Sequence, residues 1–412
     1  MNVVEKRQVG EKLPKGWKWV KLGEICEINP TRPRGLSRDD DSQTTFVPMP
    51  SVDARLGKIT SPEIRPFSEV RKGYTYFEEN DVLFAKISPC MENGKHSIAS
   101  DLIDSFGFGT TEFHVLRAGS LVIPGWIHKF LRQPKISEEA VEHFSGSVGQ
   151  QRVPAEYLSN LEILLPPLPE QKRIVGILSD RLTAIDKARA AIEAQLKAAK
   201  ALPAAYFRQV FDSPEAQKWK RKKLGDVCDI STGTTPATNQ SHYYEGATPF
   251  VRTSEIINNV ITQTETNITQ QAINDYSLKL YPSGTVLMAM YGQGKTRGQV
   301  AILEIPATTT QNAAAMVPCA DLSSEYLWYW LRGQYEYLRK LGYQGDISHL
   351  SLKYVKQLEI PWVPIGNQKK IVLSLDDRMT AVNKLQRSLQ SQLTTISQLP
   401  AATLRQAFNG EL

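Results

Sequence analysis

Two long stretches of the chain carry apolar residues at helical spacing. In residues 171–211 and again in residues 368–408, the apolar positions alternate steps of four and three. This spacing lines one face of a helix that packs against another helix. The predicted helix-pair core comprises Leu178, Leu182, Ile185, Ile192, Leu196, Leu375, Met379, Val382, Leu389 and Leu393. The pattern therefore predicts two long helices that pair through these faces.

The two stretches are also copies of each other. A shift of 197 residues aligns them without a gap, and 19 of 41 positions are identical, far more than unrelated helices share. Arg189 and Gln386 interrupt the apolar face at the same place. A polar residue there either fixes the register of the pair or extends its head group to solvent. Pro203 and Pro400 are expected to end or kink the helices.

A second, weaker repeat frames the segment before each helix. Residues 19–28 (WVKLGEICEI) correspond to residues 221–230 (RKKLGDVCDI), and residues 157–163 (YLSNLEI) correspond to residues 354–360 (YVKQLEI). Between these frames, short apolar runs indicate buried strands, and helical patterns follow later in each segment. The predicted fold class is therefore α+β, with two homologous globular domains separated by two long antiparallel coiled-coil helices and a pseudo-two-fold internal repeat.

The predicted organisation has four parts. A first globular domain covers residues 1–165, a first helix region 166–212, a second globular domain 213–362 and a second helix region 363–412. A chain of 412 residues is too long for one ordinary core, which agrees with two domains. An antiparallel helix pair would place the two globular domains at opposite ends.

Composition and charge narrow the class of protein. Hydrophobic residues make up 41% and charged residues 22% of the chain, which is typical of a soluble globular protein. A bilayer-spanning run of ~20 apolar residues and a secretory segment are both missing from the sequence, so we expect a cytoplasmic protein without membrane association. The 4 cysteines and 6 histidines lack metal-ligand spacing. A net charge of +6 permits a polyanionic partner without requiring one.

Sequence motifs for catalysis are missing. Residues 292–296 (GQGKT) resemble the end of a phosphate-binding loop, but Ala289 stands where that motif requires glycine. The Asn/Asp-Pro-Pro-aromatic tetrad of amino-methyltransferases does not occur. Glu170 has the acid-x-lysine form of a nuclease, but the second copy has Asn367 there, and an acid at a helix start is favoured by the helix dipole. We therefore expect a non-catalytic chain that binds no metal or cofactor itself.

Five short segments carry a further signal. They are PPLPEQKRIV at 166–175, DVLFAKISPCMENGK at 81–95, MYGQGKTRG at 290–298, AFNGEL at 407–412 and the opening WVKLGEICEI. Together with the doubled helix and the doubled globular domain, they resemble the DNA specificity subunits of type I restriction-modification systems over nearly the whole chain. The second copy departs from the pattern, with Gly-Asn-Gln where the first has Pro-Glu-Gln.

The resemblance implies a non-catalytic subunit with two target recognition domains, each of which reads one half of a bipartite site in double-stranded DNA. It implies that the helices set the gap between the halves and hold two methylation subunits. Those subunits transfer a methyl group from S-adenosylmethionine to adenine, so this cofactor is expected on the partner. A restriction subunit can join such a complex.

Polar loop residues are the candidates for DNA contact. A glycine-rich loop such as 290–298 can approach a nucleic-acid backbone closely, and lysine, arginine and glutamine suit phosphates and base edges. The candidates are Lys86, Asn93, Lys95, Gln151, Arg152, Gln293, Lys295, Arg297, Gln344 and His349. A tight turn or a solvated loop explains the same residues without function.

Two other functions compete with DNA recognition. A protein-only scaffold, whose helices recruit partners and whose globular domains bind peptides, would have the same doubled organisation. A single-chain restriction enzyme would need catalytic motifs that the sequence lacks. Methylated adenines that share one gapped sequence would distinguish a DNA adaptor from a scaffold.

Overall fold

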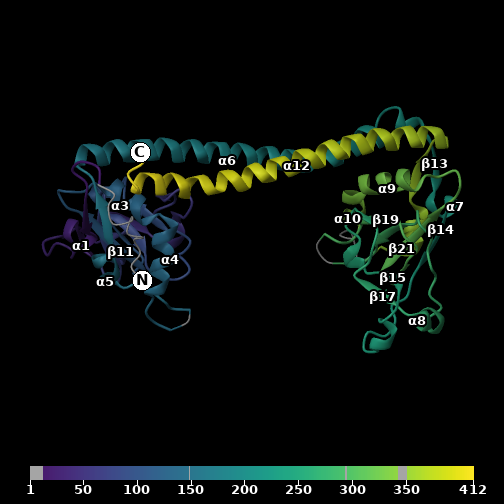
Figure 1. Ribbon diagram of the computed structural model, residues 1–412, viewed down its shortest axis with the longest axis horizontal. Helices are drawn as coiled ribbons and strands as arrows, with labels where there is room; N and C mark the ends of the chain where they lie inside the picture. Colours follow the sequence, from purple (N-terminus) through teal and green to yellow (C-terminus); the bar gives the residue numbers. More distant parts are fainter. Residues whose placement is uncertain (1–12, 148, 293–294, 342–349) are drawn as a thin grey trace. The chain divides into compact units, whose positions relative to one another are not determined.

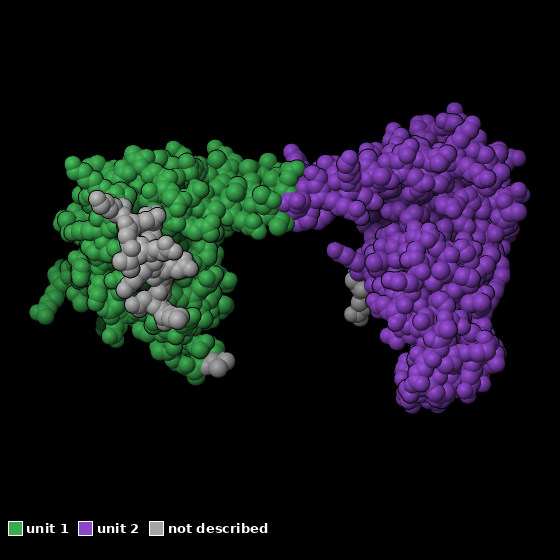
Figure 2. All heavy atoms as spheres, in the orientation of Figure 1, with its two compact units in different colours: residues 1–192, 392–412 green, residues 193–391 purple. Residues whose placement is uncertain are grey.

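A computed structural model represents the chain, and the structure describes residues 13–147, 149–292, 295–341 and 350–412. The chain divides into two compact units (Figure 2). Unit 1 comprises residues 1–192 and 392–412, and unit 2 comprises residues 193–391. The division passes through both long helices, α6 (Leu168–Phe211) and α12 (Ile365–Phe408). Each unit therefore contains one globular domain and a part of each helix.

Unit 1 combines short strands with short helices (Figure 1). Its strands are β1 (Lys18–Lys21), β2 (Cys26–Ile28), β3 (Gln43–Val47), β4 (Val52–Asp53), β5 (Lys58–Ile59), β6 (Glu63–Pro66), β7 (Thr75–Glu78), β8 (Val82–Ala85), β9 (His96–Ile98), β10 (Phe106–Gly109), β11 (Phe113–Ala118) and β12 (Glu162–Leu165). Its helices before α6 are α1 (Leu22–Ile25), α2 (Phe67–Val70), α3 (Pro124–Leu131), α4 (Pro134–Glu142) and α5 (Ala155–Asn160). The strands form sheets with the orders β2-β11-β8-β9 and β6-β3-β10-β7, together with the pairs β1-β12 and β4-β5.

The central strand β8 is apolar throughout because both faces of its sheet are covered. Val82 and Phe84 pack in a buried cluster with Trp126 of α3, whereas Leu83 and Ala85 face a second buried cluster. Such a strand gives a continuous apolar run instead of an alternating one. This explains why the sequence signal at this strand is strong.

Unit 2 repeats the plan with variations. Its strands are β13 (Lys220–Lys223), β14 (Cys228–Thr232), β15 (Thr248–Val251), β16 (Val260–Ile261), β17 (Thr266–Ile268), β18 (Val286–Ala289), β19 (Val300–Leu303), β20 (Thr308–Thr309), β21 (Ala313–Pro318) and β22 (Glu359–Trp362). Its helices other than α6 and α12 are α7 (Leu224–Val227), α8 (Gln270–Asp275), α9 (Ser324–Gly333), α10 (Tyr335–Leu341) and α11 (Leu352–Gln357). The sheet orders are β14-β21-β18-β19-β16, β17-β15-β20 and β13-β22.

Side chains at equivalent positions attach α3 to the β1-β12 pair in unit 1 and α9 to the β13-β22 pair in unit 2. In unit 1 the Trp126 indole donates from Nε1 to the Leu164 carbonyl over 3.1 Å. In unit 2 the Tyr326 hydroxyl donates to the Pro361 carbonyl over 2.9 Å. Both rings are fully buried. The two domains thus share a packing scheme although the residue types differ.

The two long helices lie side by side within each unit. In unit 1, Ile174 and Leu178 of α6 share a buried cluster with Leu404 and Phe408 of α12, and the centre of the Phe408 ring lies 4.5 Å from that of the Trp126 ring. The beginning of α6 therefore lies beside the end of α12.

In unit 2 the order is reversed. Leu375 and Met379, near the beginning of α12, pack with Phe207 and Phe211, near the end of α6. The helices are antiparallel, and the predicted fold class is confirmed. The predicted helix-pair core divides by burial as follows: Leu178, Leu196, Leu375, Met379, Val382 and Leu389 are buried, and Leu182, Ile185, Ile192 and Leu393 are half-buried.

Neither proline ends its helix. Pro203 lies inside α6 and Pro400 inside α12, and each helix of 44 residues continues past its proline. Of the two outcomes that the sequence suggested, an end at the proline is therefore wrong. A proline lacks the N–H that would bond to the carbonyl one turn earlier, so each helix contains a carbonyl that needs another donor.

Candidate nucleic-acid interface

In the first globular domain, several predicted contact residues meet at the end of strand β8. The Lys86 amide donates to the Glu112 carbonyl over 2.9 Å, and the Lys86 carbonyl accepts from the Val153 amide over 2.9 Å. The Arg152 guanidinium donates to both carboxylate oxygens of Glu112, from Nε and Nη2, over 2.8 Å each. The Gln151 carbonyl accepts from the Ser88 amide over 3.0 Å. We call this group of Lys86, Glu112, Gln151 and Arg152 the β8 corner.

The charges of the β8 corner influence one another. The two hydrogen bonds from Arg152 lower the pKa of Glu112, which keeps this carboxylate ionised. Burial lowers the pKa of Lys86, an effect that Arg152 increases and Glu112 opposes. The β8 corner contains two cations, Lys86 and Arg152, and one carboxylate, Glu112. It therefore carries a net positive charge that can attract an anionic partner.

The second globular domain has the same backbone frame with different side chains. The Met290 amide donates to the Asn312 carbonyl over 2.9 Å, and the Met290 carbonyl accepts from the Leu350 amide over 3.0 Å. Met290 and Asn312 thus take the places of Lys86 and Glu112. The two domains therefore hold different side chains in the same backbone frame: a half-buried lysine in the first and a buried methionine in the second.

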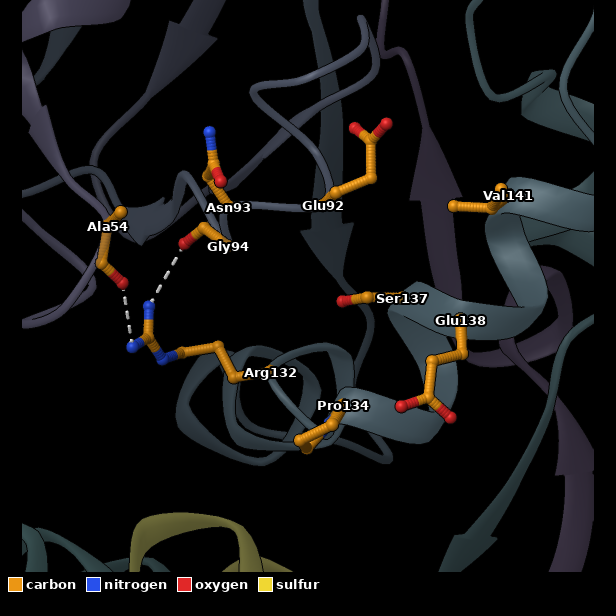
Figure 3. A pocket seen from close by; sticks show the side chains of 9 residues that line it. All are labelled: Ala54, Glu92, Asn93, Gly94, Arg132, Pro134, Ser137, Glu138 and Val141. Carbon is orange, nitrogen blue, oxygen red and sulfur yellow. Dashed lines mark hydrogen bonds between the residues drawn. The ribbon is translucent and has the colours of Figure 1, made fainter. Parts of the chain in front are cut away.

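Two further candidates of the first domain lie apart from the β8 corner. Lys95 donates from Nζ to the carbonyls of Met49 and Val52, over 2.9 and 3.1 Å, so its ammonium group is engaged in holding a loop. Asn93 is exposed and lines a cavity of about 460 Å³ (Figure 3). Arg132 lines the same cavity and reaches the carbonyls of Ala54 and Gly94.

In the second domain, Lys295 is exposed, and its carbonyl accepts from the Tyr335 hydroxyl over 2.7 Å. Arg297 is half-buried and donates from Nη2 to the Arg339 carbonyl of α10 over 3.2 Å. These contacts attach the glycine-rich loop to α10. The other candidates, Gln293, Gln344 and His349, lie outside the described residues.

The family of the chain follows from comparison with known proteins. Residues 14–198 and 216–395 match the family model of the type I restriction modification DNA specificity domain. The chain belongs to this family. The two matched segments correspond to the two halves of the internal repeat, so the chain contains two copies of this domain.

Several relatives resemble parts of the chain. The EcoEI specificity subunit of Escherichia coli is 36% identical over 207 residues, which cover 50% of the chain and 34% of that subunit. The EcoAI specificity subunit of Escherichia coli is 40% identical over 167 residues, which cover 40% of the chain and 27% of that subunit. The chain thus spans about a third of the length of these relatives.

A solved structure is similar over almost the full length. It belongs to work on complex assembly and conformational transition of the type I R-M system, and it matches with a TM-score of 0.81 and 25% identity. The match covers 98% of the chain and 100% of that chain. The similarity thus includes both domains and both long helices.

The structure also gives a role to two equivalent glutamines, which the sequence shows only as part of a repeated motif. Gln171 and Gln368 are fully buried at equivalent positions of the two DNA specificity domains. Gln171 accepts from the Ile123 amide over 3.0 Å and donates to the carbonyls of Leu121 and Pro166 over 2.9 and 2.8 Å. Each side-chain amide therefore ties the start of a long helix to its own globular domain.

Gln368 makes the corresponding bonds in the second copy. It accepts from the Ser323 amide over 2.8 Å and donates to the carbonyls of Asp321 and Val363 over 2.9 and 2.8 Å. Identity of the glutamine in both copies, next to a position that changes from Glu170 to Asn367, was the signal that could have singled it out. Glu170 itself pairs with Arg173 on the helix surface, which agrees with a structural role at a helix start.

The reactive groups of the described residues are few. Burial raises the pKa of the Cys26 and Cys228 thiols to about 12, so both stay protonated at neutral pH. Within the part of the chain that the structure describes, His, Cys, Asp and Glu side chains form no group that could hold a metal ion. In the same residues, none of the helices has the length and apolar character to cross a bilayer.

Proposed function

We propose that the chain is the DNA specificity subunit of a type I restriction-modification complex, in which each globular domain reads one half of a bipartite, gapped DNA site. The observation that carries this proposal is the repeated frame around Lys86 and Met290, which holds different side chains in the two domains. Basic side chains supply affinity through phosphates, and loop side chains select bases. The β8 corner is the part of the first domain that we assign to this contact.

The long helices set the gap between the two half-sites in this proposal. Support comes from their continuity past Pro203 and Pro400 and from the equivalent attachments at Gln171 and Gln368. A helix fixed at its start to a globular domain transmits a defined distance, whereas a flexible linker would permit many spacings.

The chemistry belongs to partner subunits. Two methylation subunits dock on the helix pair, bind S-adenosylmethionine and methylate an adenine that has been turned out of the duplex. A restriction subunit completes the complex in cells that cleave unmodified DNA. The assembly works in the cytoplasm, where the DNA is.

Co-expression with a methylation subunit of the same family, followed by sequencing of methylated adenines, tests the function. We expect one sequence motif with two specified halves and a fixed unspecified gap. The double variant Lys86→Ala/Arg152→Ala should relax or abolish one half and leave the other half intact. Methylation without a motif, or binding of partners without any dependence on DNA sequence, would favour the protein-only scaffold.

A further inference from the structure

Four cations of unit 1 lie together where the β4-β5 hairpin meets α3 and α6. Arg132, directly after α3, donates from Nη1 to the Gly94 carbonyl over 3.2 Å and from Nη2 to the Ala54 carbonyl over 3.0 Å (Figure 3). Its Nη2 also donates to the Arg55 carbonyl over 2.7 Å. The Arg55 Nη1 atom lies 3.3 Å from a carboxylate oxygen of Asp186 on α6.

Two lysines complete this group. Lys129 precedes Arg132 by one helical turn and so lies on the same face of α3. Lys58 is exposed on β5, the second strand of the hairpin. We call Arg55, Lys58, Lys129 and Arg132 the basic notch.

Positive charge predominates in the basic notch itself, where the cations interact with the carboxylates of Asp53 and Asp186. Two further carboxylates, those of Glu92 and Glu138, line the adjoining cavity beside Arg132 (Figure 3). Burial, together with the charges of Arg132 and Lys58, lowers the pKa of Lys129 to about 8. A lysine that merely stabilised the C-terminal end of α3 would gain from the helix dipole, which favours the charged form. Burial and the neighbouring cations therefore outweigh the helix dipole at Lys129.

The notch is also preorganised. Gly57 adopts a φ of +62°, and a Cβ atom at this position would lie 2.4 Å from Nη1 of Arg132. A side chain at this position would be strained at this φ and would displace the guanidinium group of Arg132. The three carbonyls that hold Arg132 fix its orientation before any ligand arrives. Arg132 therefore has a fixed orientation, and the exposed Lys58 and the half-buried Lys129 are the groups that can meet an anion.

The corresponding region of unit 2 has a different character. Its strand β16 lies beside β19 and carries exposed Val260, and Ile257 before it is 58% exposed. At the positions of α9 that correspond to Lys129 and Arg132 stand Tyr329 and Arg332, and the Arg332 guanidinium lies 4.5 Å from the Trp328 ring centre. The charge accumulation is thus a feature of unit 1 and not of the shared frame.

We propose that the basic notch binds a backbone phosphate of the DNA duplex beside the half-site that the first globular domain reads. The inference rests on the proposed function. Phosphate is the ligand that fits, because lysine and arginine side chains from different elements converge on one place and form charge-assisted hydrogen bonds with its oxygens. Such contacts position a protein on DNA and carry no base information. The occupant would offset the charge repulsion that Lys129 experiences.

Salt-dependent DNA binding by the complex of the full chain with its methylation subunits tests the notch. The probe is a DNA duplex that contains the sequence motif identified by adenine methylation. The variant Lys58→Gln/Lys129→Gln should weaken binding equally for cognate and unrelated duplexes and reduce the slope of log K against log salt by roughly 1 to 2. The control Lys15→Gln/Lys18→Gln removes the same charge at two exposed positions of unit 1 and should leave the slope unchanged.

Two further measurements separate phosphate binding from a structural role. Ethylation of single phosphates should interfere with binding of the unmodified complex at a phosphate beside one half-site, and this interference should disappear in the notch variant. Lys129→Met should raise the thermal midpoint of the chain while it weakens DNA binding, since it removes a half-buried charge. Should Lys129 variants fail to fold, Lys58→Gln alone should reduce the slope by roughly 1.

A notch variant that still bound its motif with an unchanged salt slope and an unchanged interference pattern would refute phosphate binding by the basic notch and leave the proposed function intact. Loss of methylation-subunit binding at an unchanged slope would also overturn it and assign the notch to an acidic protein surface. If the complex with the wild-type chain bound no duplex selectively, the proposed function would be refuted, and phosphate binding by the basic notch with it.

Discussion

The contact between Gln386 and α6 leads to a quantitative prediction. Gln386 donates from Nε2 to the Ala199 carbonyl over 3.0 Å. Ala199 lies one turn before Pro203, so its carbonyl has lost its usual helical donor. The polar residue that interrupts the apolar face of α12 therefore replaces a missing backbone hydrogen bond on the neighbouring helix. This contact favours the register-fixing interpretation of Gln386 over a side chain that merely reaches solvent.

The magnitude follows from burial. Ala199 is 2% exposed, so its carbonyl cannot turn to water when Gln386 is replaced. Gln386→Met keeps the length and flexibility of the side chain but removes the donor. An unpaired buried carbonyl costs about 1–3 kcal/mol, and because Gln386 is itself half-buried we expect about 1–2 kcal/mol. The variant should therefore open the helix pair locally.

Hydrogen exchange followed by mass spectrometry measures this opening in the peptides that cover residues 193–203 and 380–391. A loss of about 1–2 kcal/mol corresponds to exchange that is roughly 5- to 30-fold faster. Pro203→Ala restores the N–H within α6, so Gln386→Met should have almost no effect in that background, which gives a coupling energy of about 1 kcal/mol or more. Equal acceleration by Gln386→Met with and without Pro203 would refute the reasoning.

Three other outcomes follow from contacts described above or from buried charges of unit 1. Gln171→Leu leaves one amide and two carbonyls unpaired at a fully buried site, so it should destabilise unit 1 by about 2–4 kcal/mol; urea unfolding measures the loss, and a neutral result would contradict the role of the side chain. Burial lowers the pKa of His96 to about 3 and that of His128 well below its usual value. Below about pH 6.5 the unfolded chain therefore binds more protons than the folded chain. The free energy of unfolding should then fall with decreasing pH, by up to about 1.4 kcal/mol per pH unit for each histidine. Equal urea midpoints at about pH 7.5 and about pH 5.5 would contradict this expectation. Asp81, which is 2% exposed, accepts two hydrogen bonds from Arg117 over 3.0 and 2.7 Å, and Arg117 also pairs with Glu78. Because Arg117 keeps this second carboxylate, Asp81→Asn should cost about 1.5–3 kcal/mol in a thermal or urea unfolding experiment, whereas the surface variant Glu63→Gln should have little effect.

The helices and the doubled organisation could be predicted from the sequence because both depend on local, repeated signals. Apolar spacing identifies a helix face without knowledge of its partner, and a gap-free repeat shows that the pattern is not an accident. The extent of the helices was less predictable. Local rules assign an end or a kink to Pro203, but in the structure α6 continues past it. The Ala199 carbonyl before the proline accepts from Gln386, and Phe207 after it packs in the core of unit 2.

The candidate site depended on contacts between distant residues, which one sequence does not disclose. Arg152 meets Glu112 across a separation of 40 residues, and Lys95 reaches the Met49 carbonyl across 46. Residue type alone suggested that both side chains were available to DNA. The structure shows that the Lys95 ammonium group donates to neutral carbonyls of a loop, whereas the Arg152 guanidinium is paired with the Glu112 carboxylate. Lys95 and Arg152 therefore differ in the net charge that they can present.

The composition of unit 1 has a consequence for the order of folding. The core of this unit contains Trp126, Leu178 and Phe408 in one buried cluster. During synthesis the first globular domain leaves the ribosome early, but the apolar side chains of α6 beside it gain their cover only after residues 404–408 have been made. The domain that is translated first is therefore completed last, and until then its exposed apolar face is a target for chaperones.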